Sequence, residues 1–184
     1  AATTSATVGT TLGVTGITTP TGGIAAAGGF TMSPRNVSVG GTQAMLAADG
    51  NNSTPVITEQ YVSEIFVPAN MTVTGVSVFN GSDVTGNMMV GLGSTGGAVL
   101  ATSAATAGLG TDAYQLVPFT APLAVKGPAT YYILTQYSSA TARYNTFAVG
   151  NFGCVADTGN TFGTLTAFTA PTTFVTAICN IASL

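Results

Sequence analysis

The stretch YVSEIFVPANMTVTGVSVFN, residues 61–80, decides the fold of this 184-residue chain. Two runs rich in β-branched and aromatic residues, Tyr61–Val67 and Met71–Asn80, flank the turn residues Pro68 to Asn70. This is the pattern of two consecutive antiparallel strands. Around Gly75 the alternation of apolar residues shifts by one position, and such a shift at a glycine predicts a β-bulge and a bend.

Similar runs recur through the rest of the chain, separated by Gly, Asn, Asp and Pro. Further strands are predicted at Met88–Leu92, Val99–Ala104, Tyr114–Phe119, Thr130–Tyr137, Ala142–Val149 and Phe174–Ile181. Gly96 and Gly97 predict a tight hairpin, and the stretch from Pro118 to Pro122 predicts a corner. Roughly seven to nine short strands without a convincing helix indicate an all-β fold, an antiparallel jelly-roll-like β-sandwich over residues 55–184.

Residues 1–54 differ from this body, because they are rich in Thr, Gly and Ala and carry only isolated larger apolar residues. The glycine content is too high for a stable isolated sheet, and no apolar stripe has the period of a helix. We expect an extended arm that ends at the turn cluster Asp49 to Ser53. Its apolar side chains are predicted to anchor it on a neighbouring surface: Leu12, Val14, Ile17, Ile24 and Phe30.

Charged residues make up only 5% of the chain, where an ordinary soluble domain has about 25%. The apolar fraction of 46% argues against disorder. The net charge of −3 and the three cationic residues leave no basic patch, so direct binding to nucleic acid is not expected. No apolar run reaches the ~18 residues of a membrane helix, and no membrane association is expected.

The chain contains no histidine, which removes every mechanism that uses imidazole as base or metal ligand. Glu59 and Glu64 lie close in sequence, but a separation of five residues places them on opposite faces of a strand. Solvated carboxylates are therefore favoured over a glycosidase pair. Lys126 lies in a Val-Lys-Gly-Pro turn and is favoured as a surface lysine over a catalytic base. No spacing matches a metal site, so we expect no enzyme activity, metal or cofactor.

Cys154 and Cys179 are the two cysteines of the chain. One disulfide between them would close a long loop. The favoured interpretation is that both are small buried apolar side chains, because unpaired cysteines are among the most buried residues.

Four residues form a candidate carbohydrate-binding set: Tyr132, Tyr137, Tyr144 and Asn145. Aromatic faces are common in ligand sites and stack on sugar rings. The favoured alternative is that Tyr131 and Tyr132 point to opposite faces of one strand, one into the core and the other covering the outside. The chain also has no Trp, the residue most used in carbohydrate platforms.

Residues 61–138 carry a further set of turn and strand motifs. They are a strand ending in Val67-Pro68, Thr74-Gly75-Val76 in the next strand, Gly97 to Leu100 before a strand of small residues, and the run from Gly127 to Tyr132, Gly-Pro-Ala-Thr-Tyr-Tyr. These motifs resemble a recurrent β-sandwich module of virion proteins of tailed bacteriophages. Ala129 departs from the pattern, because a second glycine would suit that corner.

In that family such modules serve as capsid decoration (cement) proteins or as parts of fibres and spikes, and they carry no catalytic residues. The resemblance therefore implies a structural virion protein, and we favour a decoration protein on the capsid surface. Its partners would be a major capsid protein and other copies of itself, with a trimer expected at local threefold positions. The alternative is a glycan-binding module of a fibre, spike or adhesin, on a virion or otherwise extracellular; an enzyme that uses Glu64 ranks below both.

Overall fold

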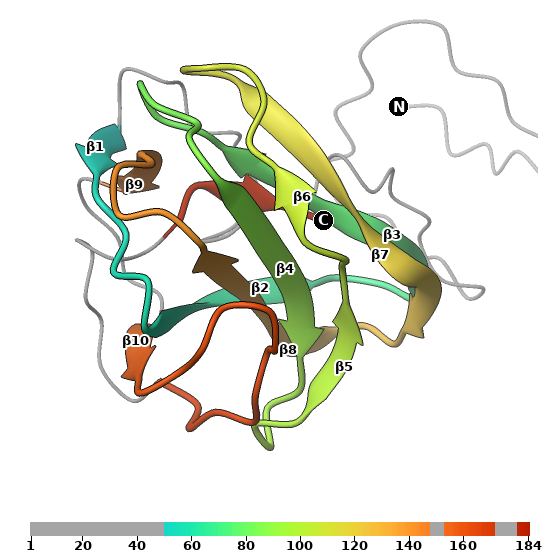
Figure 1. Ribbon diagram of the computed structural model, residues 1–184. Helices are drawn as coiled ribbons and strands as arrows, with labels where there is room; N and C mark the ends of the chain where they lie inside the picture. Colours follow the sequence, from blue (N-terminus) through green and yellow to red (C-terminus); the bar gives the residue numbers. More distant parts are fainter. Residues whose placement is uncertain (1–49, 148–152, 172–179) are drawn as a thin grey trace, which may run out of the picture.

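The computed structural model describes residues 50–147, 153–171 and 180–184. In these ranges the chain is all-β, every strand pairing is antiparallel and no helix occurs (Figure 1). The strands are β1 (Gly50–Ser53), β2 (Glu59–Val67), β3 (Met71–Phe79), β4 (Asn87–Gly93), β5 (Val99–Thr102), β6 (Thr106–Ala107), β7 (Tyr114–Val125), β8 (Ala129–Tyr137), β9 (Tyr144–Phe147), β10 (Cys154–Thr158) and β11 (Ala182–Ser183).

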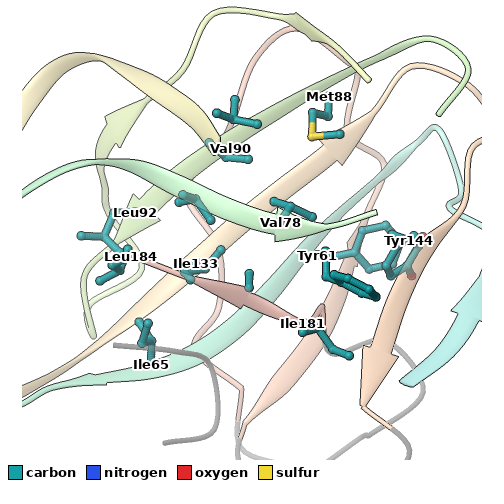
Figure 2. Packing of buried hydrophobic residues seen from close by; sticks show 14 of the residues in the cluster. Tyr61, Ile65, Val78, Met88, Val90, Leu92, Ile133, Tyr144, Ile181 and Leu184 are labelled. Atoms are coloured by element: carbon teal, nitrogen blue, oxygen red, sulfur yellow. The ribbon is translucent and has the colours of Figure 1, made fainter. Parts of the chain in front are cut away.

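The larger sheet has the order β10-β2-β8-β4-β5, with β6 also paired to β4. A second sheet has the order β11-β3-β7, and β1 pairs with β9 in a separate ladder. The larger sheet and the β11-β3-β7 sheet both contribute side chains to one hydrophobic core. Ile65 and Ile133 of the larger sheet pack there with Val78 of β3 (Figure 2). Full burial of such a side chain stabilises the fold by about 1.5–3 kcal/mol. The predicted all-β sandwich is thus confirmed, while the jelly-roll connectivity stays a prediction.

The β-bulge predicted at Gly75 is confirmed, because the register of β3 against β7 shifts between Val73 and Gly75. A Cβ atom at Gly75 would lie only 2.5 Å from the carbonyl oxygen of Val117, so the close approach of the two backbones requires glycine here. On the β7 side, residues 119–122 lie opposite the single residue Thr74. The corner predicted between Pro118 and Pro122 is wrong: β7 continues to Val125, and the irregularity is absorbed as a bulge within the strand.

Two other boundaries differ from the prediction. Gly50–Ser53, which the sequence places in the arm, form β1 and pair with β9, so the folded body begins before Pro55. Strand β10 was not predicted; it is short and lies between Gly153 and Gly159. Most of the predicted closing strand Phe174–Ile181 lies outside the described residues, as do the last two residues of the predicted strand Ala142–Val149.

Residues 159–171, here called the covering loop, pack on the outer face of the larger sheet without forming a strand. Leu165 and Phe168 of this loop form a second hydrophobic cluster with Val62 of β2 and with Tyr132 and Leu134 of β8. As a result the middle parts of β2 and β8 are buried on both faces, which explains why Val62, Tyr132 and Leu134 are apolar as well as the core-facing residues of these strands.

Candidate functional site

The residues predicted as sugar contacts do not form an exposed platform. Tyr137 and Tyr144 are 2% and 1% exposed, and Asn145 is also buried. The rings of Tyr137 and Tyr144 stack in the core with centroids 5.1 Å apart, and Tyr61 lies 5.2 Å from Tyr144. Figure 2 shows Tyr61 and Tyr144 side by side within the core. The predicted set is therefore part of the packing that holds the strands together.

Tyr132 faces the opposite side of β8, where its ring meets Phe168 of the covering loop at a centroid distance of 5.4 Å. Tyr131 packs against the main core instead. The favoured interpretation, that the two neighbouring tyrosines point to opposite faces, is confirmed. Because a strand alternates its faces, no single ligand can contact both Tyr132 and Tyr137.

Burial controls the ionisation of these tyrosines. Desolvation is the main reason that the pKa values of Tyr137 and Tyr144 are raised far above the ordinary value, and the neighbouring phenols add to the effect. The pKa of Tyr61 is also raised, chiefly by burial, although the backbone N–H of Val56 donates a hydrogen bond to its hydroxyl at 2.8 Å. All three hydroxyls therefore stay neutral at physiological pH, and the three rings act as packing groups of the core.

The two carboxylates examined as a catalytic pair also have structural positions. Glu64 accepts a hydrogen bond from the backbone N–H of Gly153 at 2.9 Å, while its own N–H donates to the Gly153 carbonyl at 2.8 Å. Glu59 lies at the start of the same strand, opposite Thr158 of β10. Glu64 thus fastens the segment that enters β10 and is not paired with Glu59.

Cys154 is fully buried and takes part in a disulfide, so the interpretation of this residue as a free thiol is wrong. Cys179 lies outside the described residues, and its pairing with Cys154 stays a prediction. The predicted arm anchors also lie outside the described part of the chain: Leu12, Val14, Ile17, Ile24 and Phe30.

The charged residues are distributed unevenly. Between Ile65 and Val125 the only charged residues of the sequence are Asp83 and Asp112. Backbone hydrogen bonds hold both near Gly81: the N–H of Arg143 donates to the Asp83 carbonyl at 2.7 Å, and the N–H of Asp112 donates to the Gly81 carbonyl at 2.9 Å. Hydrogen bonds from Thr85 lower the pKa of Asp83, with a smaller contribution from Arg143. The sheet formed by β11, β3 and β7 contains no charged residue at all.

The outer face of that uncharged sheet exposes apolar side chains. Along β7, exposed Tyr114, Leu116 and Pro118 alternate with buried Gln115, Val117 and Phe119. Leu116 is 61% exposed and Tyr114 is 45% exposed, and the Tyr114 ring also packs on Phe79 of β3 at 4.8 Å. Exposed sheet faces and edges of soluble proteins normally carry charged residues that oppose association. This apolar row is here called the β7 face.

A groove lies beside the β7 face, between two strand edges. It has a volume of about 350 Å³ and is lined by Val99 to Thr102 of β5 and by Thr120 to Leu123 of β7. The strands meet at one end, where Ser103 and Phe119 form an isolated bridge and the Thr120 hydroxyl donates to the Thr102 carbonyl at 3.1 Å. Beyond that bridge no strand pairing joins β5 to β7 in the described residues.

Sequence reasoning did not find the β7 face or the groove. One signal was present: in Tyr114–Phe119 apolar residues occupy both alternating positions, so one set had to lie outside the core. The groove carries no comparable signal, because it lies beside the bulge of β7 and next to the isolated bridge between Ser103 and Phe119. Neither can be read from local residue patterns.

No family model matches the chain, and no curated protein or solved structure matches it. In the described part of the chain, no helix has the length and apolar character needed to cross a membrane. The same residues hold no cluster of three or more metal-ligating side chains.

Proposed function

We propose that this protein is a structural, non-catalytic component of a virion, a capsid decoration protein that attaches through uncharged apolar surface. The observation that carries the proposal is the β7 face, where Leu116 and its neighbours are exposed on a sheet without a charged residue. The low overall charge and the resemblance of residues 61–138 to virion modules point in the same direction.

Contact with a capsid removes apolar side chains from water, and each fully buried aliphatic side chain contributes about 1.5–3 kcal/mol. Because many copies bind one shell, a modest contribution per copy reinforces the whole particle. Few ion pairs are available at such an interface, so attachment should depend little on salt. No residue set of the described structure favours the carbohydrate-binding alternative, since its four candidate contacts are buried.

The test is attachment to purified particles that contain the protein, with Leu116→Asp compared with Thr141→Asp. Leu116→Asp places a carboxylate on the β7 face, whereas Thr141→Asp places the same charge at an exposed turn beside Ala142 and Arg143. We expect Leu116→Asp to be lost from the particles. Thr141→Asp and the unchanged chain should both stay attached up to about 1 M NaCl. Release of the unchanged chain by moderate salt, or equal retention of both variants, contradicts the proposal.

A further inference from the structure

We infer that the groove between β5 and β7 binds residues 10–19 of a neighbouring copy of this chain as an added strand. The inference deepens the proposed function and rests on it, because contact between copies is what an assembling protein requires.

The rims of the groove are strand edges with backbone available for pairing. Strand β5 pairs with β4 on one side only, and the Val99–Thr102 edge on its other side faces the groove. Strand β7 is the last strand of the β11-β3-β7 sheet, and on its edge away from β3 it has, among the described residues, only the bridge at Phe119. An edge of this kind is a template for another strand, and addition of an extended segment would supply its missing hydrogen bonds.

The shape of the groove favours an extended segment. The bridge between Ser103 and Phe119 closes one end, and from there the two rims run for four residues each without pairing in the described structure. Four residues of extended chain span about 13 Å. An extended segment paired with one rim would add a strand at this edge of the sandwich.

The lining favours an uncharged occupant, because none of its side chains is charged. Valine, leucine, alanine, threonine and proline line the groove, and none of these can pair with a charged partner. The first 34 residues of the chain likewise contain no charged residue, and Arg35 is the first. Within them, the run TTLGVTGITT at 10–19 places Leu12 and Val14 two positions apart, which puts both on one face of an extended strand.

The length of chain before β1 allows the segment to reach another copy. Residue 19 is separated from Gly50 by 30 residues, and an extended chain covers about 3.3 Å per residue. Strand β1, where this chain joins the body, lies on the other side of the molecule from β5 (Figure 1). The segment of a neighbour is therefore long enough to reach the groove.

The first experiment uses photo-crosslinking of the full chain. Ala121 is replaced by the photoreactive amino acid benzoylphenylalanine, and a second variant carries the same replacement at Ala124, an exposed position of β7 outside the groove. After irradiation, we expect the Ala121 variant to give species of twice the chain mass on a denaturing gel. Mass spectrometry should place the crosslink in the tryptic peptide that ends at Arg35, and the Ala124 variant should not give this product.

Crosslinks from position 121 to the same peptide within a single chain would overturn the inference, because the occupant would then be the chain's own segment. Crosslinks to any other region, or to no region, would overturn it as well. The position-124 variant controls for random collisions between copies.

The second experiment measures self-association by light scattering. We expect Ala121→Asp to weaken self-association of the full chain at least about tenfold, because it places a charge among apolar groups, while Ala124→Asp leaves it unchanged. Self-association that survives Ala121→Asp overturns the groove as the docking site. If the full chain is monomeric at every concentration, the inference that one copy binds the segment of another is overturned. The attachment of Leu116→Asp to particles then tests the proposed function separately.

Discussion

At the scale of single residues, glycines of the β4–β5 hairpin provide space for the covering loop. A Cβ atom would lie 2.4 Å from the Phe168 ring at Gly93 and 2.0 Å from the Phe168 carbonyl oxygen at Gly97. Gly97 also has a φ of +82°, a conformation that other residues adopt only with strain. Its neighbour Gly96 has no atom nearer than the Ser94 hydroxyl at 3.8 Å, so the two glycines differ in what they must accommodate.

Gly97→Ala should therefore lower the free energy of unfolding by about 1–3 kcal/mol, because the new methyl group displaces Phe168 and the backbone is strained. Gly96→Ala should change it by less than about 0.5 kcal/mol, as an exposed substitution in open space. Urea denaturation of both variants measures the difference. Equal effects of the two substitutions would show that the covering loop does not depend on this contact.

At the scale of elements, the covering loop is held by glutamine side chains in place of a strand ladder. The amide of Gln60 donates to the Thr166 carbonyl at 3.0 Å and accepts from the Thr166 N–H at 2.9 Å. The amide of Gln136 donates to the Thr164 carbonyl at 3.1 Å. A primary amide imitates the donor and acceptor of a peptide group, so these two side chains act as partners for the loop backbone.

Gln60→Ala should leave the N–H and carbonyl of Thr166 without these partners, at a cost of about 1–3 kcal/mol to the docked loop. We expect amide hydrogen exchange in residues 159–171 to become about tenfold faster or more, while protection of the β3–β7 pairing stays the same. Thr158→Ala, at an exposed position of β10, is the control. Uniform acceleration across both sheets would instead mean that the loop and the sandwich unfold together.

At the scale of the whole molecule, three tyrosines connect separate strands at the centre of the core. Tyr61 comes from β2, Tyr137 from β8 and Tyr144 from β9, which also pairs with β1. Burial raises the pKa of each hydroxyl, so the folded protein keeps its protons to a higher pH than the unfolded chain does. Their contribution to stability is complete below the ordinary tyrosine pKa and is lost as the pH rises above it.

The free energy of unfolding should accordingly show no tyrosine-dependent change below about pH 9 and fall above about pH 10. The slope should reach about 1.4 kcal/mol per pH unit for each tyrosine that stays neutral in the folded state. Urea midpoints measured across this range test the expectation, and Tyr144→Phe should make the slope shallower. Constant stability up to about pH 11 would be incompatible with buried neutral phenols.

The sequence was sufficient for those parts of the fold that depend on local pattern. The runs Tyr61–Val67 and Met71–Asn80 became β2 and β3, and the phase shift at Gly75 marked a real bulge. The hairpin at Gly96 and Gly97 was also correct, with the Gly97 N–H donating to the Ser94 carbonyl at 3.0 Å. Each of these features depends on turn residues and on the alternation of apolar and polar residues within a few positions of the sequence.

Features that join distant residues could not be predicted in this way. The covering loop brings Thr166 to Gln60, 106 positions earlier, and nothing in the loop has the period of a strand. Tyr137 and Tyr144 are predicted as surface contacts because aromatic residues occur both in protein cores and in ligand sites. Only the order of the strands in the sheets determines that these two rings lie in the core. The one indication of the loop was Gly91 and Gly93 on one face of β4, since strand glycines often mark the close approach of other chain segments.

The covering loop also has a geometric consequence for the assembly proposed here. It seals the middle of one broad face of the sandwich, where Val62, Tyr132 and Leu134 would otherwise be accessible. Phe66, near the end of β2, is 53% exposed on the same face, where the loop does not cover it. In the proposed assembly, apolar contact through this broad face would therefore be confined to the part around Phe66, whereas the β7 face of the other sheet is open along its length.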